Sequence, residues 1–329
     1  MPFNNRDRRR RSRGRVLGLA VLGLMLAVAS RAQAEPILGL TSDNRLLNFD
    51  SATPGTITNT ATITGLMGGE SLVGIDLRPR NALVYGLGRS STGSGSIYTL
   101  NTLTGMATRI AGLIANATDT TNPFTSLMGS AFGVDFNPVP DTTDAATGSL
   151  RVTSESGFNY RINANNGQVF TDGNLDYTDS DRAPRITAVA YSNNFFGATT
   201  TTLRGVDSAD PDIVATFTSA NDGTLTISNP PPALLLPFNS TDLTGYDISQ
   251  RGGIFFSATD PGATSSQLFE NVGGTFMNRG TIGGGATIVG ITATSVVPEP
   301  SSLALAGTGV AVLGLAGLAR RKRSDAQTG

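Results

Sequence analysis

The 329-residue chain contains no cysteine, no histidine and no tryptophan, and its only lysine is Lys322. The absence of cysteine excludes a disulfide framework, and the absence of both cysteine and histidine excludes the usual nucleophile pairs and zinc ligand sets. A lysine that lies only near the C-terminus excludes a P-loop or a Schiff-base site in the body. The missing tryptophan also counts against a sugar site, where aromatic platforms are expected. Carboxylates therefore remain as the side chains that could carry chemistry.

The N-terminus has the three parts of a secretory signal. Arg6 to Arg15 carries seven arginines, and Val16 to Ala29 is an uninterrupted apolar run. The segment Ala32-Gln33-Ala34 follows, with small residues at Ala32 and Ala34 where a signal peptidase cleaves. This order predicts a signal peptide over residues 1–34, cleaved after Ala34, and therefore an exported protein. An uncleaved N-terminal anchor is the alternative, and the cleavage site argues against it.

The C-terminus has the features of a membrane helix. Residues 301–319 carry no charge, and a helix of that length spans about 29 Å, close to one hydrocarbon core. Four cations follow directly, Arg320, Arg321, Lys322 and Arg323. Positive residues stay in the cytoplasm, which places the body on the other side and residues 324–329 in a cytoplasmic tail. The sequence thus predicts a membrane helix over Leu303 to Ala319.

A plain anchor does not explain the Pro298-Glu299-Pro300 sequence just before this helix. The ordered combination of Pro298, Glu299 and Pro300, an apolar helix and a basic end over residues 297–323 resembles the PEP-CTERM sorting signal of Gram-negative bacteria. The resemblance implies recognition by an exosortase, a membrane transpeptidase that cuts near the motif. It also implies a passage through the inner membrane to the cell envelope or extracellular matrix, where exopolysaccharide components are candidate partners.

The body between the two targeting segments is strongly acidic. Residues 35–297 contain twelve arginines and twenty-two acidic residues, a net charge of −10, whereas the whole chain carries −1. A body of this charge repels DNA and anionic membrane surfaces. We therefore expect no nucleic-acid partner and interpret the acidity as a solubility feature.

One strand pattern recurs along the body. Leu72 to Leu77, Phe132 to Phe136 and Leu243 to Ile248 resemble one another, and Thr187 to Tyr191 and Val289 to Thr292 are weaker copies. Gly or Ala stands at positions 74, 133, 188, 245 and 290, with gaps of 59, 55, 57 and 45 residues. Each copy alternates between small or polar residues and large apolar ones, as a strand with period two does. The shared small residue predicts a place where neighbouring faces approach closely. No amphipathic helix is predicted in the body.

Further strands follow each copy and complete a repeat of four. They are expected at 82–87, 96–101, 106–111, 150–153, 157–163, 168–171, 253–258, 267–271 and 275–277. The chain starts with three strands, 37–41, 46–50 and 57–63, and ends with a single one in 286–293. The three strands at the start and the one at the end together complete a further four-stranded repeat. The pattern therefore predicts an all-β propeller over residues 35–296 with five four-stranded blades closed by both termini. A β-sandwich or an irregular β-solenoid is the alternative.

The body also resembles the bacterial domain of unknown function numbered 4394. The segments that carry the resemblance are Ile37-Leu38-Gly39-Leu40, Leu72-Val73-Gly74-Ile75-Asp76-Leu77-Arg78-Pro79 and Gly133-Val134-Asp135-Phe136-Asn137-Pro138. It extends over about residues 36–293. The resemblance implies no established activity and no catalytic residues.

Three aspartates occupy equivalent places in the repeat, namely Asp76, Asp135 and Asp247. If the repeated strand lines a central channel, these carboxylates could converge at one mouth. Carboxylate pairs suffice for glycoside hydrolysis, and oxygen ligands suffice for calcium. The favoured interpretation is that each aspartate caps a local turn or pairs with an arginine such as Arg78 or Arg251. The other two repeats carry Ala190 and Thr292, as an ordinary structural repeat permits.

Two acidic loops are further candidates for a hard cation. Each places three carboxylates within seven residues, Asp176, Asp179 and Asp181 in the first and Asp207, Asp210 and Asp212 in the second. Neither has the glycine and glutamate positions of an EF-hand. Solvated loop acids are the favoured interpretation.

Together these patterns predict an exported, envelope-associated, non-enzymatic interaction or matrix module, with calcium as the only cofactor left open. The first alternative is a carboxylate-dependent glycosidase acting on exopolysaccharide. The second is a calcium-stabilised adhesin-like module.

Overall fold

The computed structural model of the protein describes residues 34–142, 149–227 and 234–294. From Glu35 onwards these residues belong to one compact unit. The predicted signal peptide up to residue 33 and the predicted sorting segment and cytoplasmic tail lie outside the described residues. No helix within the described part of the chain is long and apolar enough to cross a membrane.

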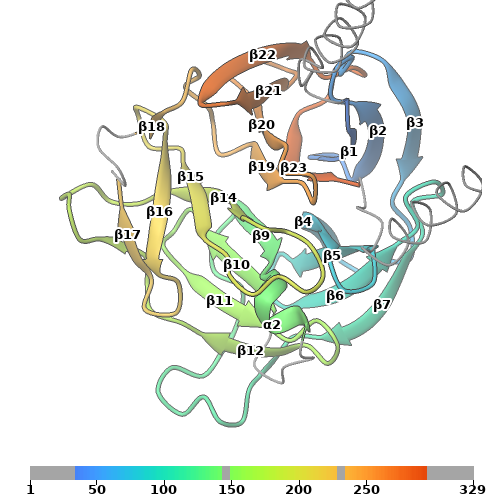
Figure 1. Cartoon of the computed structure of the whole chain (residues 1–329). Coiled ribbons are helices and arrows are strands. Elements are labelled where there is room, and N and C mark those ends of the chain that lie inside the picture. Colours follow the sequence, from blue (N-terminus) through green and yellow to red (C-terminus); the bar gives the residue numbers. More distant parts are fainter. Residues whose placement is uncertain (1–33, 143–148, 228–233, 295–329) are drawn as a thin grey trace, which may run out of the picture. The chain divides into compact units, whose positions relative to one another are not determined.

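Five sheets surround a common centre, and they are antiparallel except where two short outer strands pair in parallel (Figure 1). Their innermost strands are β4 (Glu70–Arg78), β9 (Phe132–Phe136), β14 (Ile186–Tyr191), β19 (Thr244–Ile248) and β23 (Ile288–Ala293). These strands contact one another in cyclic order, and β23 returns to β4. The fold is therefore a five-bladed β-propeller, which confirms the predicted blade number and excludes the sandwich and the solenoid.

The remaining strands follow outwards from the innermost strand of each blade. Blade 1 continues with β5 (Leu83–Ser90), β6 (Gly95–Leu100) and β7 (Ala107–Gly112), and blade 2 with β10 (Leu150–Ser154), β11 (Asn159–Ile162) and β12 (Gln168–Thr171). Blade 3 continues with β15 (Leu203–Asp207), β16 (Ile213–Ser219) and β17 (Thr224–Thr226), and blade 4 with β20 (Ile254–Ala258), β21 (Gln267–Val272) and β22 (Thr275–Thr281). Three two-residue strands extend blades 2 and 3: β8 (Ile114–Ala115) on β12, β13 (Asp176–Tyr177) on β17 and β18 (Leu234–Leu235) on β16.

Blade 5 closes the ring with strands from both ends of the body. Its inner strand β23 pairs with β1 (Pro36–Thr41), and β2 (Arg45–Asp50) and β3 (Ile57–Thr62) lie outside β1. The register places Ile37 opposite Ala293 and Gly39 opposite Ile291. The three-plus-one closure expected from the strand pattern is thus the closure that forms.

The core lies between neighbouring blades. Leu87 and Ile97 of blade 1 pack in one cluster with Phe132 and Val152 of blade 2, and a second cluster joins blade 5 to blade 1. Because the inner strands are covered on both faces, every residue of β9, β14 and β19 is buried. The alternation seen in the sequence therefore distinguishes small from large residues here, not exposed from buried ones.

The repeated glycine lets the inner strands approach one another. A Cβ added at Gly74 would lie 2.4 Å from Cγ2 of Val134 in the next blade, and one at Gly245 would lie 2.9 Å from the Ile291 nitrogen. At Gly133 the added atom would come within 2.8 Å of the Ala188 carbonyl carbon. These contacts confirm the predicted close approach, which a side chain would prevent.

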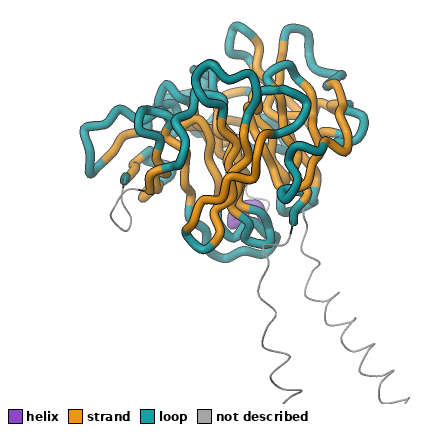
Figure 2. The backbone as a smooth tube through the Cα atoms, turned by 90° about the horizontal axis from the view of Figure 1, so that it is seen from above, coloured by secondary structure: helices purple, strands orange, loops and turns teal. Residues whose placement is uncertain are grey.

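In the part of the chain that the structure describes, one short helix interrupts the strands and loops (Figure 2). This helix, α2, covers Pro138–Thr142 directly after β9 and was not predicted. Asn137 accepts a hydrogen bond from the Val139 N–H at its start, and Arg78 of blade 1 forms a buried ion pair of 2.7 Å with Asp141. Five residues are too few to show a helical period, which explains why the sequence pattern did not reveal it.

Candidate functional site

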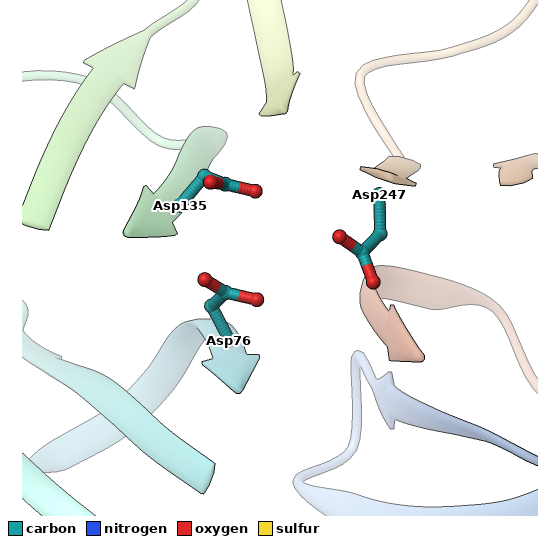
Figure 3. Close-up of side chains that lie close together, drawn as sticks. All are labelled: Asp76, Asp135 and Asp247. Carbon is teal, nitrogen blue, oxygen red and sulfur yellow. The ribbon is translucent and has the colours of Figure 1, made fainter. Parts of the chain in front are cut away.

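The structure brings Asp76, Asp135 and Asp247 together at the axis of the propeller, and we call them the axial triad. The three residues lie near the C-terminal ends of β4, β9 and β19, and their carboxylates point toward one another (Figure 3). One carboxylate oxygen from each lies within 4.8 Å of the others. Each residue is only 1% exposed, so the axial triad is enclosed and does not line a solvent-filled mouth.

Each carboxylate of the axial triad is bonded to the backbone of the next blade. Asp76 Oδ2 accepts a hydrogen bond of 2.8 Å from the Phe136 N–H, and Asp135 Oδ1 accepts one of 3.3 Å from the Tyr191 N–H. Asp247 Oδ2 accepts one of 2.5 Å from the N–H of Ala293. In every case the donor is the residue after the equivalent position of the following blade. The aspartates therefore join blade to blade and do not cap local turns.

The equivalent residues of the other two blades complete the pattern differently. Thr292 Oγ1 accepts a hydrogen bond of 3.1 Å from the Leu77 N–H and donates one of 3.0 Å to Asp76 Oδ1. Ala190 has no polar side chain, so blade 3 offers no such bond. The sequence pattern predicts no role for Thr292. In the structure its hydroxyl joins blade 5 to blade 1, as each aspartate joins its blade to the next.

No arginine neutralises the axial triad within the described residues. Arg78, a predicted partner, instead forms its ion pair with Asp141 and donates to Tyr85 and Asn165. The ion pairs of the described chain do not include any of the three aspartates. The expected arginine pairing is thus not found for these residues, because ring curvature turns them toward the axis, while Asp76 Oδ1 does accept a local hydrogen bond of 2.7 Å from the Leu77 N–H.

Burial makes the ionised forms of these carboxylates unfavourable. Burial, followed by the charge of Asp247, raises the pKa of Asp76 well above its usual range. Burial and the charges of the other two members do the same to the pKa of Asp135, and burial raises the pKa of Asp247 to about 6. The axial triad consequently favours states in which protons or a cation compensate its charge.

Two further polar features adjoin Asp247. Its Oδ1 atom is buried and has no hydrogen-bond partner. Glu35, only 4% exposed, adds a nearby negative charge that contributes to the raised pKa of Asp247, and its Oε1 accepts a hydrogen bond from Ser249. Glu35 was not among the predicted site residues, because no repeat or motif of the sequence includes it.

The dimensions of the axis limit what the axial triad can do. Glycosidases place two carboxyl groups about 5–9.5 Å apart around a sugar. The axial carboxylates are closer and enclosed, and the cavity at the neighbouring glycine layer, lined by Gly74, Gly133, Gly245 and Gly290, is only about 10 Å³. This space does not admit a sugar ring. The arrangement can hold protons or a single small cation.

The two acidic loops do not assemble into similar groups. Asp207 forms an ion pair of 2.9 Å with Arg182 and accepts a hydrogen bond from Tyr177, while Asp212 Oδ2 accepts two from Ser240. Asp179 accepts a hydrogen bond from the Ile227 N–H. The remaining members, Asp176, Asp181 and Asp210, are exposed. Across the residues that the structure describes, the axial triad is the only group of three carboxylates close enough to share an ion.

A family model described as Domain of unknown function (DUF4394) matches residues 45–292. No curated protein matches the chain.

Solved structures resemble the fold at low sequence identity. A chain of a nidogen/laminin complex is 12% identical, with a TM-score of 0.45, and the match covers 80% of this chain and 99% of that one. A calcium-binding regucalcin from Agrobacterium tumefaciens is 12% identical, with a TM-score of 0.35 and 68% of each chain covered. A periplasmic gluconolactonase from Pseudomonas aeruginosa is 13% identical, with a TM-score of 0.34, and the match covers 82% of this chain and 70% of that one. Likeness at this level carries no inference about ligand or activity.

Proposed function

The chain belongs to the family described as Domain of unknown function (DUF4394), and from that premise we propose that it is an exported, non-catalytic binding module of the cell envelope. One observation supports the proposal that the module is not catalytic. The three carboxylates best placed to act together are enclosed at the axis, where they accept backbone hydrogen bonds from the next blade. Side chains used in this way hold the ring together and have no route to a polysaccharide.

The export and sorting part of the proposal is supported by the two ends of the sequence. The signal peptide leads the body across the inner membrane, and the helix from Leu303 to Ala319 holds it there transiently. An exosortase then recognises Pro298, Glu299 and Pro300 and transfers the body to the envelope or the extracellular matrix.

Replacement of all three motif residues by alanine tests the sorting step. The variant should remain unprocessed in the inner membrane fraction, which immunoblots of fractionated cells and the intact mass of the protein report. Replacement of Ser301 and Ser302 by alanine is the matched control and should leave processing unchanged. Normal processing of the motif variant would count against an exosortase.

An open groove on blades 2 and 3 is the place where we expect an envelope polysaccharide to bind, through its charged and polar groups, because the lining has no aromatic side chain on which a sugar ring could stack. Its volume is about 680 Å³, within the range of ligand sites, and its lining includes Glu155, Arg182, Arg185 and Asp210. The mixture of charges suits a polar ligand. Ala183 is an exposed residue of this lining, so a large side chain there should narrow the groove without disturbing the core.

Binding of the full-length protein to exopolysaccharide purified from the producing cells tests this assignment. The wild type should be retained on the immobilised polymer, and Ala183→Trp should reduce retention at least fivefold. Ala52→Trp, on the exposed loop between β2 and β3, is the control and should bind normally. Equal retention of both variants would overturn the groove assignment, and release of reducing ends from the polymer would overturn the non-catalytic proposal.

A further inference from the structure

We propose that the axial triad binds one hard divalent cation of the calcium class and thereby ties blades 1, 2 and 4 together. The first ground is charge. Three carboxylates lie within 4.8 Å of one another, each residue is 1% exposed, and no arginine within the described chain is ion-paired with them. Ionised carboxylates this deep are tolerated when they coordinate a metal ion. This site is separate from the groove and does not depend on the proposed envelope ligand.

The second ground is an unpaired oxygen inside the site. Asp247 Oδ2 is bonded to the Ala293 N–H, whereas no donor reaches the buried Asp247 Oδ1 with good hydrogen-bond geometry, although Ile248 and Thr292 lie close enough to lower the pKa of Asp247. The carboxylate of Asp247 points toward the other two (Figure 3). A buried acceptor that has no donor demands an explanation, and a cation bound between the carboxylates supplies the missing partner.

The spacing of the oxygens fits a calcium ion. Calcium binds oxygens at about 2.3–2.6 Å, so two ligands on opposite sides of one ion lie up to about 5 Å apart. One oxygen from each member of the axial triad lies within 4.8 Å of the others. Three oxygens spaced evenly around one calcium ion lie at most about 4.5 Å apart, so small rotations of the side chains, without a movement of the strands, bring all three within reach of an ion.

The chemistry of the ligands and their attachment set the preference among metals. Every available donor is an oxygen, and the chain has neither histidine nor cysteine for softer metals. Asp76, Asp135 and Asp247 are each bonded to the backbone of the next blade, so their positions are set by the ring. Magnesium demands a near-ideal octahedron at about 2.0–2.1 Å, whereas calcium accepts irregular oxygen sites. Calcium should therefore bind more tightly than magnesium.

The experiment uses the full-length protein, stripped of metal by chelator and dialysed, with CaCl₂ or MgCl₂ as the only added ligand. Calorimetric titration should show one calcium per chain and weaker binding of magnesium, and calcium should raise the melting temperature. Asp135→Asn and Asp247→Asn should each weaken calcium binding at least tenfold. Asp135 is the gentler site, because its carboxylate accepts only the Tyr191 N–H and asparagine retains an acceptor.

Asp212→Asn is the matched control, because Asp212 is also 1% exposed and also has a buried oxygen without a partner, but it lies outside the axial triad. This variant should bind calcium as the wild type does. Circular dichroism verifies that each variant is folded. The proposal is overturned if the stripped wild type binds no calcium, if magnesium binds more tightly, or if folded Asp135→Asn or Asp247→Asn binds calcium undiminished.

Discussion

The Oδ2 atom of Asp76 lies 2.8 Å from the backbone nitrogen of Phe136, 60 residues further along the chain and in the next blade. Phe136 belongs to β9, the inner edge strand of its sheet, which pairs with β10 alone along its ladder. An edge strand leaves N–H groups without strand partners, and a buried one must find an acceptor elsewhere. The aspartate of the preceding blade supplies that acceptor. The contact that joins two blades therefore also gives the inner-strand N–H its hydrogen bond.

Thr292 should be the clearest test of these blade-to-blade bonds, because valine has nearly its shape. Thr292→Val removes the acceptor for the Leu77 N–H and the donor to Asp76 Oδ1. A buried donor left unpaired costs about 1–3 kcal/mol, so the free energy of unfolding should fall by that amount in urea titrations. Thr58→Val, at an exposed position, should change it by less than about 0.5 kcal/mol. Equal stability of the two variants would show that the hydrogen bonds of the Thr292 hydroxyl do not contribute to stability.

The stability of the metal-free protein should fall as the pH rises. Burial raises the pKa of Asp247 to about 6 from 3.8, so the folded state holds a proton that the unfolded state has already released. A raised folded pKa contributes stability that is complete below the unfolded pKa and is lost as pH rises through the folded pKa. The window for Asp247 is therefore about pH 4–6, and the loss amounts to about 3 kcal/mol.

Urea unfolding in chelator across pH 4–7, for the wild type and Asp247→Asn, isolates this effect. Asparagine does not titrate, so the variant should gain stability relative to the wild type as the pH rises. Asp76 and Asp135, whose pKa values are also raised by burial, extend the remaining decline of both proteins to higher pH. A constant difference between the two proteins would mean that Asp247 does not titrate in this range.

Gly74 should tolerate no side chain unless its neighbour becomes smaller. An added Cβ would lie 2.4 Å from Cγ2 of Val134 and 2.9 Å from its Cβ. Gly74→Ala should therefore lower the free energy of unfolding by about 1–3 kcal/mol, the usual cost of overpacking. The double variant with Val134→Ala should lose less free energy of unfolding than the sum of the two single changes. The smaller side chain at position 134 makes room for the methyl group added at position 74. Gly68→Ala, where the added atom meets nothing within 4 Å, is the control and should be nearly neutral.

Arg78 should be among the most sensitive charged residues of the body. Its guanidinium is buried, pairs with Asp141 of α2, and lies 5.4 Å from the ring centres of Tyr85 and Phe136. Arg78→Met removes the guanidinium from its buried ion pair with Asp141, and removal of one partner of a buried pair costs about 3–5 kcal/mol. Thermal unfolding measures the loss. Arg251→Met, at an exposed turn, should have little effect, and a similar loss in both variants would point to a general loss of charge and not to the pair.

The strand pattern was predictable because it is local. Alternation of small and large residues in the inner strands, glycine at the repeated position, and turns between strands all depend on neighbours a few residues apart. The closing blade was predictable for the same reason, since three strands before the first copy and one at the last imply a shared sheet. Helix α2 escaped prediction because its five residues are too few to show a helical period, and part of its support is the ion pair with Arg78, which is distant in the sequence.

The order of residues is enough to predict an all-β repeat closed by both ends of the body, and it rules out histidine and cysteine chemistry. The environment of Asp76, Asp135 and Asp247 follows from the folded ring alone. Whether a carboxylate meets solvent, an arginine or a backbone N–H depends on which strand lies opposite, and that strand comes from some 45–60 residues away. The curvature of the ring, which no local pattern encodes, turned three ordinary strand residues into one enclosed cluster of charge.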